Sequence, residues 1–159
     1  MTNENKIVIF DVDGTLSDPS HRRHFVRTKP ANWFAFNELM VDDGINEQVV
    51  EVYKSLQQNG YHMVVFTARG DDYRDETVKW LEDNGILYKD LFMRREGKGE
   101  KNESGVKDSV VKQRMLDELI NKYPSKEILM AVDDRHQVVQ DVWIKNGIFV
   151  FDVGQGQIF

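Results

Sequence analysis

The sequence KIVIFDVDGTLSD, residues 6–18, contains the clearest structural signal in this chain. An apolar run over residues 6–10 ends abruptly in Asp11 and Asp13, with Gly14 directly behind them. A continuous apolar run of this length is typical of a parallel strand that is buried on both faces. Residues two apart in an extended segment point the same way, so both carboxylates can face one cavity, while Gly14 lets the backbone turn sharply. The stretch therefore predicts a buried strand that delivers two carboxylates to one place.

Composition limits the possible classes of protein. With 159 residues and 40% hydrophobic content, the chain can bury one core, so we expect a single domain over residues 1–159. A net charge of -6 argues against a broad nucleic-acid-binding surface and leaves room only for a local basic patch. The absence of cysteine excludes disulfides and thiolate metal sites. With no signal sequence, and no apolar run near the ~20 residues that cross a bilayer, we expect a cytoplasmic protein without a membrane partner.

Strand-like and helix-like segments alternate along the rest of the chain. Four further apolar runs have the length of strands, and segments of helical period lie between them. This alternation predicts an α/β fold, a doubly wound (Rossmann-like) parallel sheet with helices on both faces, and a small cap inserted after the first strand at about residues 17–45. The expected later strands are 61–66, 91–93, 127–132 and 148–151, and the expected helices lie within 46–60, 75–85, 107–124 and 135–147.

Acidic side chains follow the expected strands at one edge of the sheet. Asp11 and Asp13 follow the first strand, and Asp133 and Asp134 follow the fourth. Each acid could simply cap a helix or end a strand in solvent, but this does not explain why the acids come in pairs behind apolar runs. Four carboxylates gathered at one edge repel one another unless a cation lies between them. Because all available ligands are oxygen atoms, the pattern favours Mg²⁺.

Four segments in order along the chain carry a family resemblance. They are DVDGT (11–15), VVFTARG (64–70), KDSVVK (107–112) and AVDDRHQVV (131–139). Together they resemble the four motifs of the haloacid dehalogenase superfamily of phosphatases. More narrowly, they are similar to the 3′-phosphatase domains of bacteriophage polynucleotide kinase-phosphatases. The resemblance implies a phosphoric monoester hydrolase that acts through an aspartyl-phosphate.

The resemblance implies a role for each matching residue. Asp11 would be the nucleophile, and Asp13 would protonate the leaving oxygen and later take a proton from water, with a pKa raised by the crowded negative charge. Thr67 would donate hydrogen bonds to the phosphoryl oxygens, and Lys112 would place a positive charge on the same group. Lys107 competes with Lys112 for this role.

The same resemblance implies a magnesium site and two arginines that bind substrate. The ion would be held by the carboxylate of Asp11, the backbone carbonyl of Asp13, and Asp133, with Asp134 as a direct or indirect ligand. Arg69 matches an arginine of the narrower family that contacts the substrate phosphate, although an ion pair with Asp71 or Asp72 at the surface is an alternative. Arg95, in the basic stretch MRREGKGEK, also matches a family arginine and is expected to touch the substrate.

The expected cap has an unusual composition. Residues 19–37 contain no acid, although the protein is acidic overall, and Arg22 and Arg23 are expected to contact substrate. Aromatic side chains beside basic ones can stack bases, so the substrate is expected to be a phosphorylated nucleic-acid end or a nucleotide. Alternatively, Trp33, Phe36 and Met40 at helical spacing form a small core of the cap itself.

Three further functions stay open at this point. A free nucleoside monophosphate also fits an aromatic cap, and the chain departs from the narrower family at Val106, where that family has an arginine. A phosphoacceptor domain or a non-catalytic module that binds nucleic-acid ends would need fewer of the catalytic positions. The chain has no GxxxxGK[ST] sequence, so a phosphate-cradling loop for ATP is not expected.

Overall fold

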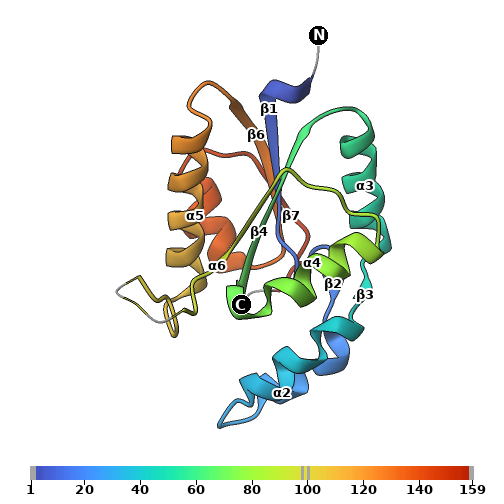
Figure 1. The fold of residues 1–159 in the computed structure, drawn as a ribbon, viewed down its shortest axis with the longest axis vertical. Helices are drawn as coiled ribbons and strands as arrows, with labels where there is room; N and C mark the ends of the chain where they lie inside the picture. Colours follow the sequence, from blue (N-terminus) through green and yellow to red (C-terminus); the bar gives the residue numbers. More distant parts are fainter. Residues whose placement is uncertain (1–2, 98, 100, 158–159) are drawn as a thin grey trace.

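Five parallel strands form the central sheet of the computed structural model, which describes residues 3–97, 99 and 101–157 (Figure 1). The order across the sheet is β5-β4-β1-β6-β7, and every neighbouring pair is parallel. The sheet therefore winds outward in both directions from β1, as expected for a doubly wound fold. The strands are β1 (Lys6–Phe10), β4 (His62–Gly70), β5 (Asp90–Arg94), β6 (Glu127–Asp133) and β7 (Val150–Asp152).

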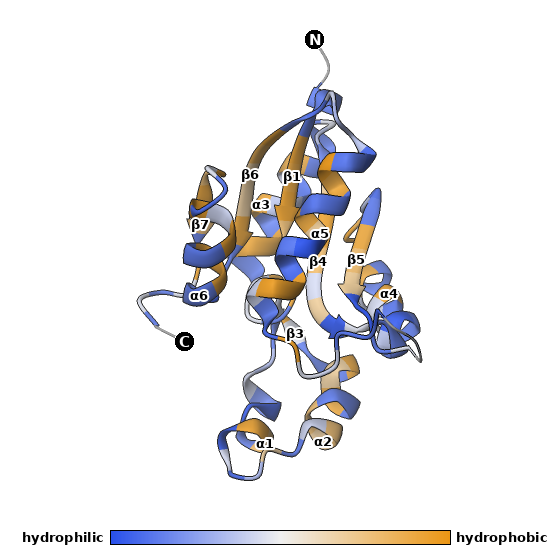
Figure 2. Cartoon of the chain, turned by 90° about the vertical axis from the view of Figure 1, so that its left-hand side faces the viewer, coloured by the Kyte–Doolittle hydropathy of each residue, from blue (hydrophilic) through white to orange (hydrophobic). Residues whose placement is uncertain are grey.

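Helices cover both faces of the sheet, which confirms the expected fold class. Along β1, Ile7 and Ile9 point to one face and Val8 and Phe10 to the other, because successive side chains of a strand alternate. Figure 2 shows the mainly hydrophobic strands between helices with hydrophilic outer faces. One face packs on α3 (Glu47–Gln58) and α4 (Arg74–Asp83), and the other on α5 (Asp108–Lys122), α6 (His136–Val138) and the π-helical η5 (Val139–Ile144). The short turn η1 (Asn3–Asn5) precedes β1, and the turn η4 (Asp71–Tyr73) joins β4 to α4.

Two of these elements differ from the sequence expectation. The second strand continues to Gly70, so Thr67 and Arg69 lie within β4 rather than after it. The pairing of β4 with β5 shifts between Thr67 and Gly70, and this irregularity lets the strand continue past the apolar run. The last helical segment begins as α6 and continues as the wider turns of η5, which carry Trp143 into the core.

The cap lies between two short strands at the carboxyl-terminal edge of the sheet. β2 (Ser17–Asp18) and β3 (Gly44–Ile45) pair antiparallel and close the insertion at its base. The cap projects from the sheet as a separate lobe in Figure 1 and has little core of its own, since Met40 is its buried apolar side chain. Between the two strands lie η2 (Ser20–Arg22), α1 (His24–Arg27), α2 (Trp33–Glu38) and η3 (Leu39–Asp42).

Within the described part of the chain, no helix combines the length and the apolar composition that crossing a membrane would need.

A buried histidine joins the starts of two strands at the opposite edge of the sheet. His62, at the start of β4, is 1% exposed. With the imidazole neutral, Nε2 donates to Asp90 Oδ2 at 3.0 Å and Nδ1 accepts from Lys126 Nζ at 2.9 Å. Burial lowers the pKa of His62 below its ordinary value, and the charge of Lys126 adds to this effect against the opposing Asp90. The fold therefore favours the neutral imidazole.

This histidine makes stability dependent on pH. Its folded-state pKa lies below that of the unfolded chain, so the unfolded chain takes up the proton first as pH falls through about 6.5. We expect the titration of His62 to shift the Tm of the protein downward between pH 7.5 and 5, by about 2–4 °C for each kcal/mol lost. In His62→Gln the decline over this window should be smaller, as measured by thermal denaturation.

The exposed His24 provides the matched control, because His24→Gln should keep the decline of the parent protein. Parallel Tm curves for the parent protein and His62→Gln would contradict the assigned role of His62.

Candidate active site

Three buried carboxylates meet where β1 and β6 end. Asp11, Asp133 and Asp134 each offer an oxygen, and these oxygens lie within 4.8 Å of one another. β1 and β6 are neighbours at the point where the sheet winds in opposite directions, which is where ligands bind in such folds. The sequence placed these acids at the same edge, and the structure brings them together.

A single lysine lies among the three acids. Lys112 Nζ, from α5, donates to Asp11 Oδ1 and to Asp133 Oδ2, both at 2.8 Å. Burial would lower the pKa of Lys112, but the two carboxylates outweigh it and raise that pKa, so the ammonium stays charged. Lys107, the other candidate, is exposed at the start of α5. The structure thus brings Lys112, and not Lys107, to the acidic cluster.

Neutral donors also contact the oxygens of the cluster. Thr15 Oγ1 donates to Asp11 Oδ2 at 3.0 Å and lies 3.2 Å from Asp134 Oδ1. Trp143 Nε1 donates to Asp133 Oδ2 at 3.2 Å. Sequence reasoning gave no role to Thr15 or Trp143. Because one ammonium faces three carboxylates, negative charge is left in excess.

This excess charge affects the protonation of the acids. Burial raises the pKa of Asp11 well above its ordinary value, and the neighbouring Asp133 and Asp134 add to the rise against the charge of Lys112. Burial likewise raises the pKa of Asp134. A divalent cation between the three acids would supply the missing positive charge, and an all-oxygen donor set suits Mg²⁺. The residues present therefore fit a magnesium ion.

Gly14 is required by the close approach of Asp134. Its φ is +81°, a conformation that side chains disfavour. A Cβ at this position would lie 2.1 Å from Asp134 Oδ2 and 3.2 Å from Arg23 Nη2. The glycine therefore lets the turn after β1 lie against the second acid of β6, with Arg23 from the cap beside it.

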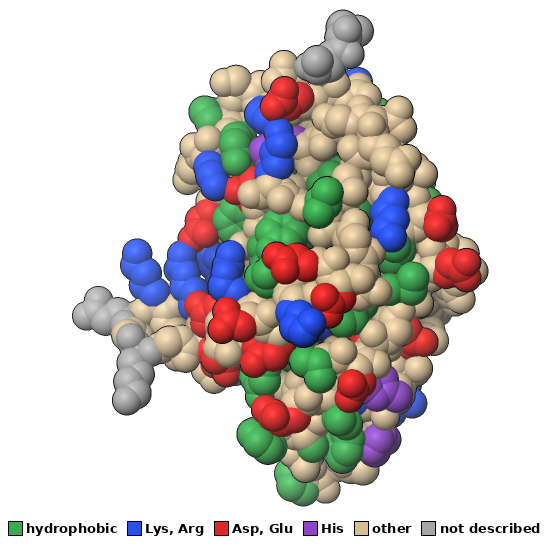
Figure 3. All heavy atoms as spheres, turned by 45° about the vertical axis from the view of Figure 1, so that its right-hand side comes forward, with side chains coloured by type: hydrophobic (Ala, Val, Ile, Leu, Met, Phe, Trp, Pro, Cys, Tyr) green, Lys and Arg blue, Asp and Glu red, His purple; other side chains and the backbone are tan. Residues whose placement is uncertain are grey.

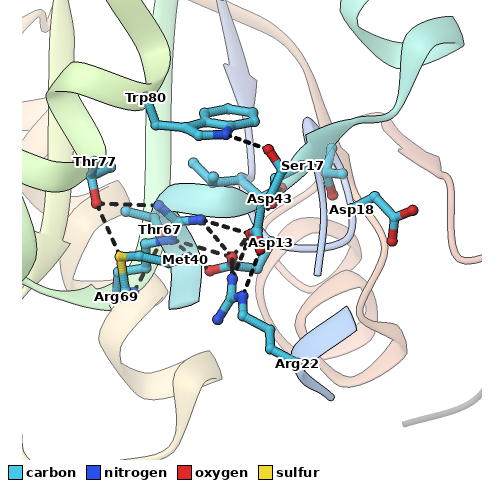
Figure 4. Close-up of polar contacts among 12 residues, drawn as sticks. Asp13, Ser17, Asp18, Arg22, Met40, Asp43, Thr67, Arg69, Thr77 and Trp80 are labelled. Atoms are coloured by element: carbon cyan, nitrogen blue, oxygen red, sulfur yellow. Dashed lines mark hydrogen bonds and ion pairs between the residues drawn. The ribbon is translucent and has the colours of Figure 1, made fainter. Parts of the chain in front are cut away.

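Asp13 is not part of the group formed by Asp11, Asp133 and Asp134, and its side chain points toward two arginines (Figure 4). Arg69 donates through Nε to Asp13 Oδ2 at 3.0 Å and through Nη2 to Oδ1 at 2.8 Å, and Arg22 Nη2 donates to Oδ1 at 2.6 Å. Burial opposes ionisation, but the two guanidinium groups outweigh it and hold the pKa of Asp13 below its ordinary value. The expectation that crowded carboxylates raise this pKa is therefore wrong for the arrangement seen here.

A second aspartate, which sequence reasoning missed, completes this arginine cluster. Asp43 accepts from Arg22 Nε at 2.7 Å and Nη2 at 2.6 Å, and from Arg69 Nη2 at 3.3 Å. Its backbone carbonyl also accepts from Trp80 Nε1 at 2.8 Å. We call Asp13, Arg22, Asp43 and Arg69 the clasp, because it joins the cap to β4 and to the turn after β1. Asp43 lies in the polar stretch VDDG, which has no periodic signal to mark it.

The other candidate residues occupy different positions. Thr67 is fully buried beside the clasp, and its Oγ1 accepts from the backbone N of Arg69 at 3.2 Å. Arg22 is buried as well, so it is not part of an exposed basic patch on the cap. Arg95 forms an ion pair with Glu118 of α5. The structure thus brings Thr67, Arg22 and Arg69 together and places Arg95 in a separate ion pair.

A buried arginine next to Arg95 was also missed. Arg94 donates to the backbone carbonyls of Ala68 at 3.0 Å and Val106 at 2.7 Å, and to Asp108 Oδ1 at 2.6 Å. It therefore ties the end of β4 to the start of α5, the helix that carries Lys112. Basic composition alone did not distinguish Arg94 from its neighbour.

The clasp should stabilise the fold strongly, because removing one carboxylate leaves buried charge without a full set of partners. We expect Asp43→Ala to lower the free energy of unfolding by about 3 kcal/mol. Urea denaturation measures this effect. The adjacent Asp42 is exposed, so Asp42→Ala is the matched control and should change stability by no more than about 0.5 kcal/mol. Equal, small losses in both variants would contradict the proposed contribution of the clasp.

Comparison with known proteins identifies related domains. Residues 5–158 match the family described as the polynucleotide kinase PNKP phosphatase domain. A chain in a Pnkp1/Rnl/Hen1 complex is 29% identical, with a TM-score of 0.74 over 96% of this chain and 47% of that chain. A chain in a Pnkp1/Rnl/Hen1 RNA repair complex is 28% identical, with a TM-score of 0.70 over 96% of this chain and 43% of that chain. This chain thus spans about half the length of these two relatives.

More distant structures share the fold. A hydrolase from Streptococcus pneumoniae TIGR4 is 14% identical, with a TM-score of 0.60 over 94% of each chain. A class C acid phosphatase from Bacillus anthracis is 17% identical, with a TM-score of 0.59 over 87% of this chain and 54% of that chain. The family match covers nearly the whole chain, including every acid of the site. The chain therefore belongs to the PNKP phosphatase domain family, within the haloacid dehalogenase superfamily of phosphatases.

Proposed function

We propose that this protein is a Mg²⁺-dependent phosphomonoesterase that removes the 3′-phosphate from polynucleotide ends through an aspartyl-phosphate. The observation that carries the proposal is the buried position of Asp11, with Lys112 Nζ at 2.8 Å and two further acids within 4.8 Å. Family membership supports the reaction class. A carboxylate held beside a fixed positive charge and a cation site is suited to attack phosphorus.

The reaction has two steps in this proposal. First, an oxygen of Asp11 forms a bond to phosphorus while the bond to the leaving oxygen breaks, and Asp13 gives its proton to that oxygen. Second, Asp13 takes a proton from water as the water attacks phosphorus. This releases inorganic phosphate and restores the carboxylate of Asp11. Lys112 and Thr67 would stabilise the charge on the phosphoryl oxygens, with Lys112 exchanging part of its contact to Asp11 for the phosphoryl group.

Magnesium would be held by the carboxylates of Asp11, Asp133 and Asp134 and by the backbone carbonyl of Asp13. When bound, it would keep Asp11 ionised and offset the negative charge that builds up on the phosphoryl group. Without it, burial favours the protonated form of Asp11, which cannot attack.

The proton on Asp13 depends on Arg69 and Arg22. In the present arrangement both arginines favour the carboxylate form of Asp13. Guanidinium groups bind phosphate in the same forked geometry as they bind a carboxylate, so an incoming phosphate can recruit Arg69. This exchange would remove one positive charge from Asp13 and raise its pKa toward the range that a general acid needs.

The proposed preference for polynucleotide ends is supported by the two relatives that are 29% and 28% identical to this chain. One of them is a chain in a complex described as an RNA repair complex. Because those chains are about twice as long as this one, their activities are not transferred as a whole. We propose only that the domain in common acts on a phosphorylated nucleic-acid end.

The assignment of the nucleophile is tested with a generic aryl phosphate. Asp11→Asn should lower kcat by at least about a thousandfold, because the amide cannot form the phosphoenzyme. EDTA should abolish the activity of the parent protein, and added Mg²⁺ should restore it. Circular dichroism checks that the variant is folded. Undiminished turnover by folded Asp11→Asn, or full activity in EDTA, would contradict the mechanism.

The substrate class is tested by measuring phosphate release from matched compounds. The value of kcat/KM for a 3′-phosphorylated oligonucleotide should exceed that for the 5′-phosphorylated oligonucleotide and for 3′- and 5′-mononucleotides, by about tenfold or more. A clear preference for mononucleotides would instead identify a nucleotidase.

A further inference from the structure

We propose that the tip of the cap binds the bases of single-stranded nucleic acid, by stacking them on Trp33 and Phe34. This inference rests on the proposed function, since it extends the phosphate site toward the rest of a polynucleotide. We call these two residues the cap platform. It would bind the nucleotides that precede the terminal 3′-phosphate.

The cap platform is exposed to an unusual degree for its residue types. Trp33 is 60% exposed and Phe34 is 72% exposed, whereas Trp80 and Trp143 are 4% and 1% exposed. Neighbouring large apolar side chains at a surface often mark a binding site. The alternative was that Trp33, Phe36 and Met40 form a core of the cap itself, but of these three only Met40 is fully buried. Figure 3 shows hydrophobic side chains gathered over the end of the molecule that the cap forms.

The platform is linked to the clasp by direct contacts. The rings of Trp33 and Phe36 meet edge to face, with centroids 5.7 Å apart. The guanidinium carbon of Arg22 lies 4.1 Å from the Phe36 ring centroid, and Arg22 Nη2 lies 2.6 Å from Asp13 Oδ1. Together these contacts span no more than about 14 Å from the Trp33 ring to Asp13 Oδ1. About four nucleotides cover this distance, at about 3.4 Å each. A strand whose terminal phosphate lies beside Asp13 can therefore reach Trp33.

The charge of residues 19–37 within the cap favours a polyanion over other partners. Residues 19–37 contain no acid in a chain whose net charge is -6. Arg22 is neutralised by Asp13 and Asp43, but Arg27 and Lys29, which precede Trp33 by six and four residues, are exposed. Exposed cations and exposed aromatic rings in one short segment suit a strand that offers phosphates and bases alternately. This complementarity selects single-stranded nucleic acid as the occupant.

Binding can be tested without catalysis by using an unphosphorylated single-stranded DNA of about ten nucleotides as the probe. Trp33 is the exposed member of the three tryptophans, so the probe should quench its fluorescence at long wavelength, and Trp33→Phe should lose this signal. Fluorescence anisotropy of the labelled DNA should give a Kd that rises at least about fivefold in Trp33→Ala and in Phe34→Ala.

The chain offers a matched control at another exposed aromatic pair. Phe149 is 67% exposed and Phe151, on the edge strand β7, is 52% exposed, with ring centroids 5.3 Å apart. Phe149→Ala should leave the Kd for DNA unchanged. If the cap variants bind DNA as tightly as the parent protein, or if Phe149→Ala weakens binding equally, the cap platform is refuted.

Activity separates this inference from the proposed function. The ratio of kcat/KM for a 3′-phosphorylated oligonucleotide to that for an aryl phosphate should fall at least about fivefold in Trp33→Ala. If Trp33→Ala hydrolyses the aryl phosphate and this ratio of kcat/KM values is the same as in the parent protein, the cap platform is refuted and the proposed phosphatase activity still stands. No hydrolysis of either compound, together with DNA binding that depends on Trp33, would refute the phosphatase and leave the platform. Sedimentation could show that the parent protein is a dimer and that Trp33→Ala is a monomer. That result would identify this surface as an interface between two copies of the chain and refute the cap platform.

Discussion

The ammonium group of Lys112 allows the carboxylates at the centre of the site to lie close together. It donates at 2.8 Å to Asp11 at the end of β1 and at 2.8 Å to Asp133 at the end of β6. Buried carboxylates at this spacing would otherwise favour protonation or move apart. One positive charge does not balance three acids, however, and burial together with the neighbouring carboxylates raises the pKa values of Asp11 and Asp134. The fold thus builds a site that a divalent cation would complete.

Asp11 and Asp13 are two residues apart but have opposite environments. The first faces acids and the second faces arginines, so burial raises the pKa of Asp11 while Arg69 and Arg22 lower that of Asp13. The proposed reaction needs the reverse, an ionised Asp11 and a protonated Asp13. A cation beside Asp11 and a phosphate on Arg69 would each move the pKa in the required direction. In the proposed mechanism, bound Mg²⁺ and substrate phosphate would therefore set the protonation states of Asp11 and Asp13.

The sequence predicts the part of the structure that follows from hydrophobic pattern and chain order. Apolar runs marked the five strands, and the order of strands and helices placed Asp11 and Asp133 at one edge. The prediction that Lys112 lies in the site came from the family resemblance. The hydrophobic pattern could not distinguish it from Lys107, which lies near the start of the same helix. Arg94 and Arg95 are neighbours in one basic stretch, and only the register of β5 decides which of them is buried.

Asp43 could not be predicted, because its burial depends on partners that are distant in sequence. Arg22 lies 21 residues before it and Arg69 lies 26 residues after it. Buried ion pairs of this kind have no periodic signature, since each charged residue alone is typical of an exposed segment. For the same reason Arg22 was expected to contact substrate, whereas two carboxylates hold it in the interior.

The clasp also explains how so small a cap is held in place. α1 and α2 contain no buried residue, so the insertion has too little apolar contact to fix its own position. Its place over the sheet depends instead on Arg22 and Asp43, whose partners are the proposed acid/base Asp13 and the proposed phosphate ligand Arg69. Any ligand that changes the charge on Asp13 or Arg69 therefore acts on the contacts that hold the cap. In the proposed mechanism, phosphate binding at Arg69 would therefore be coupled to the position of the cap through the four side chains of the clasp.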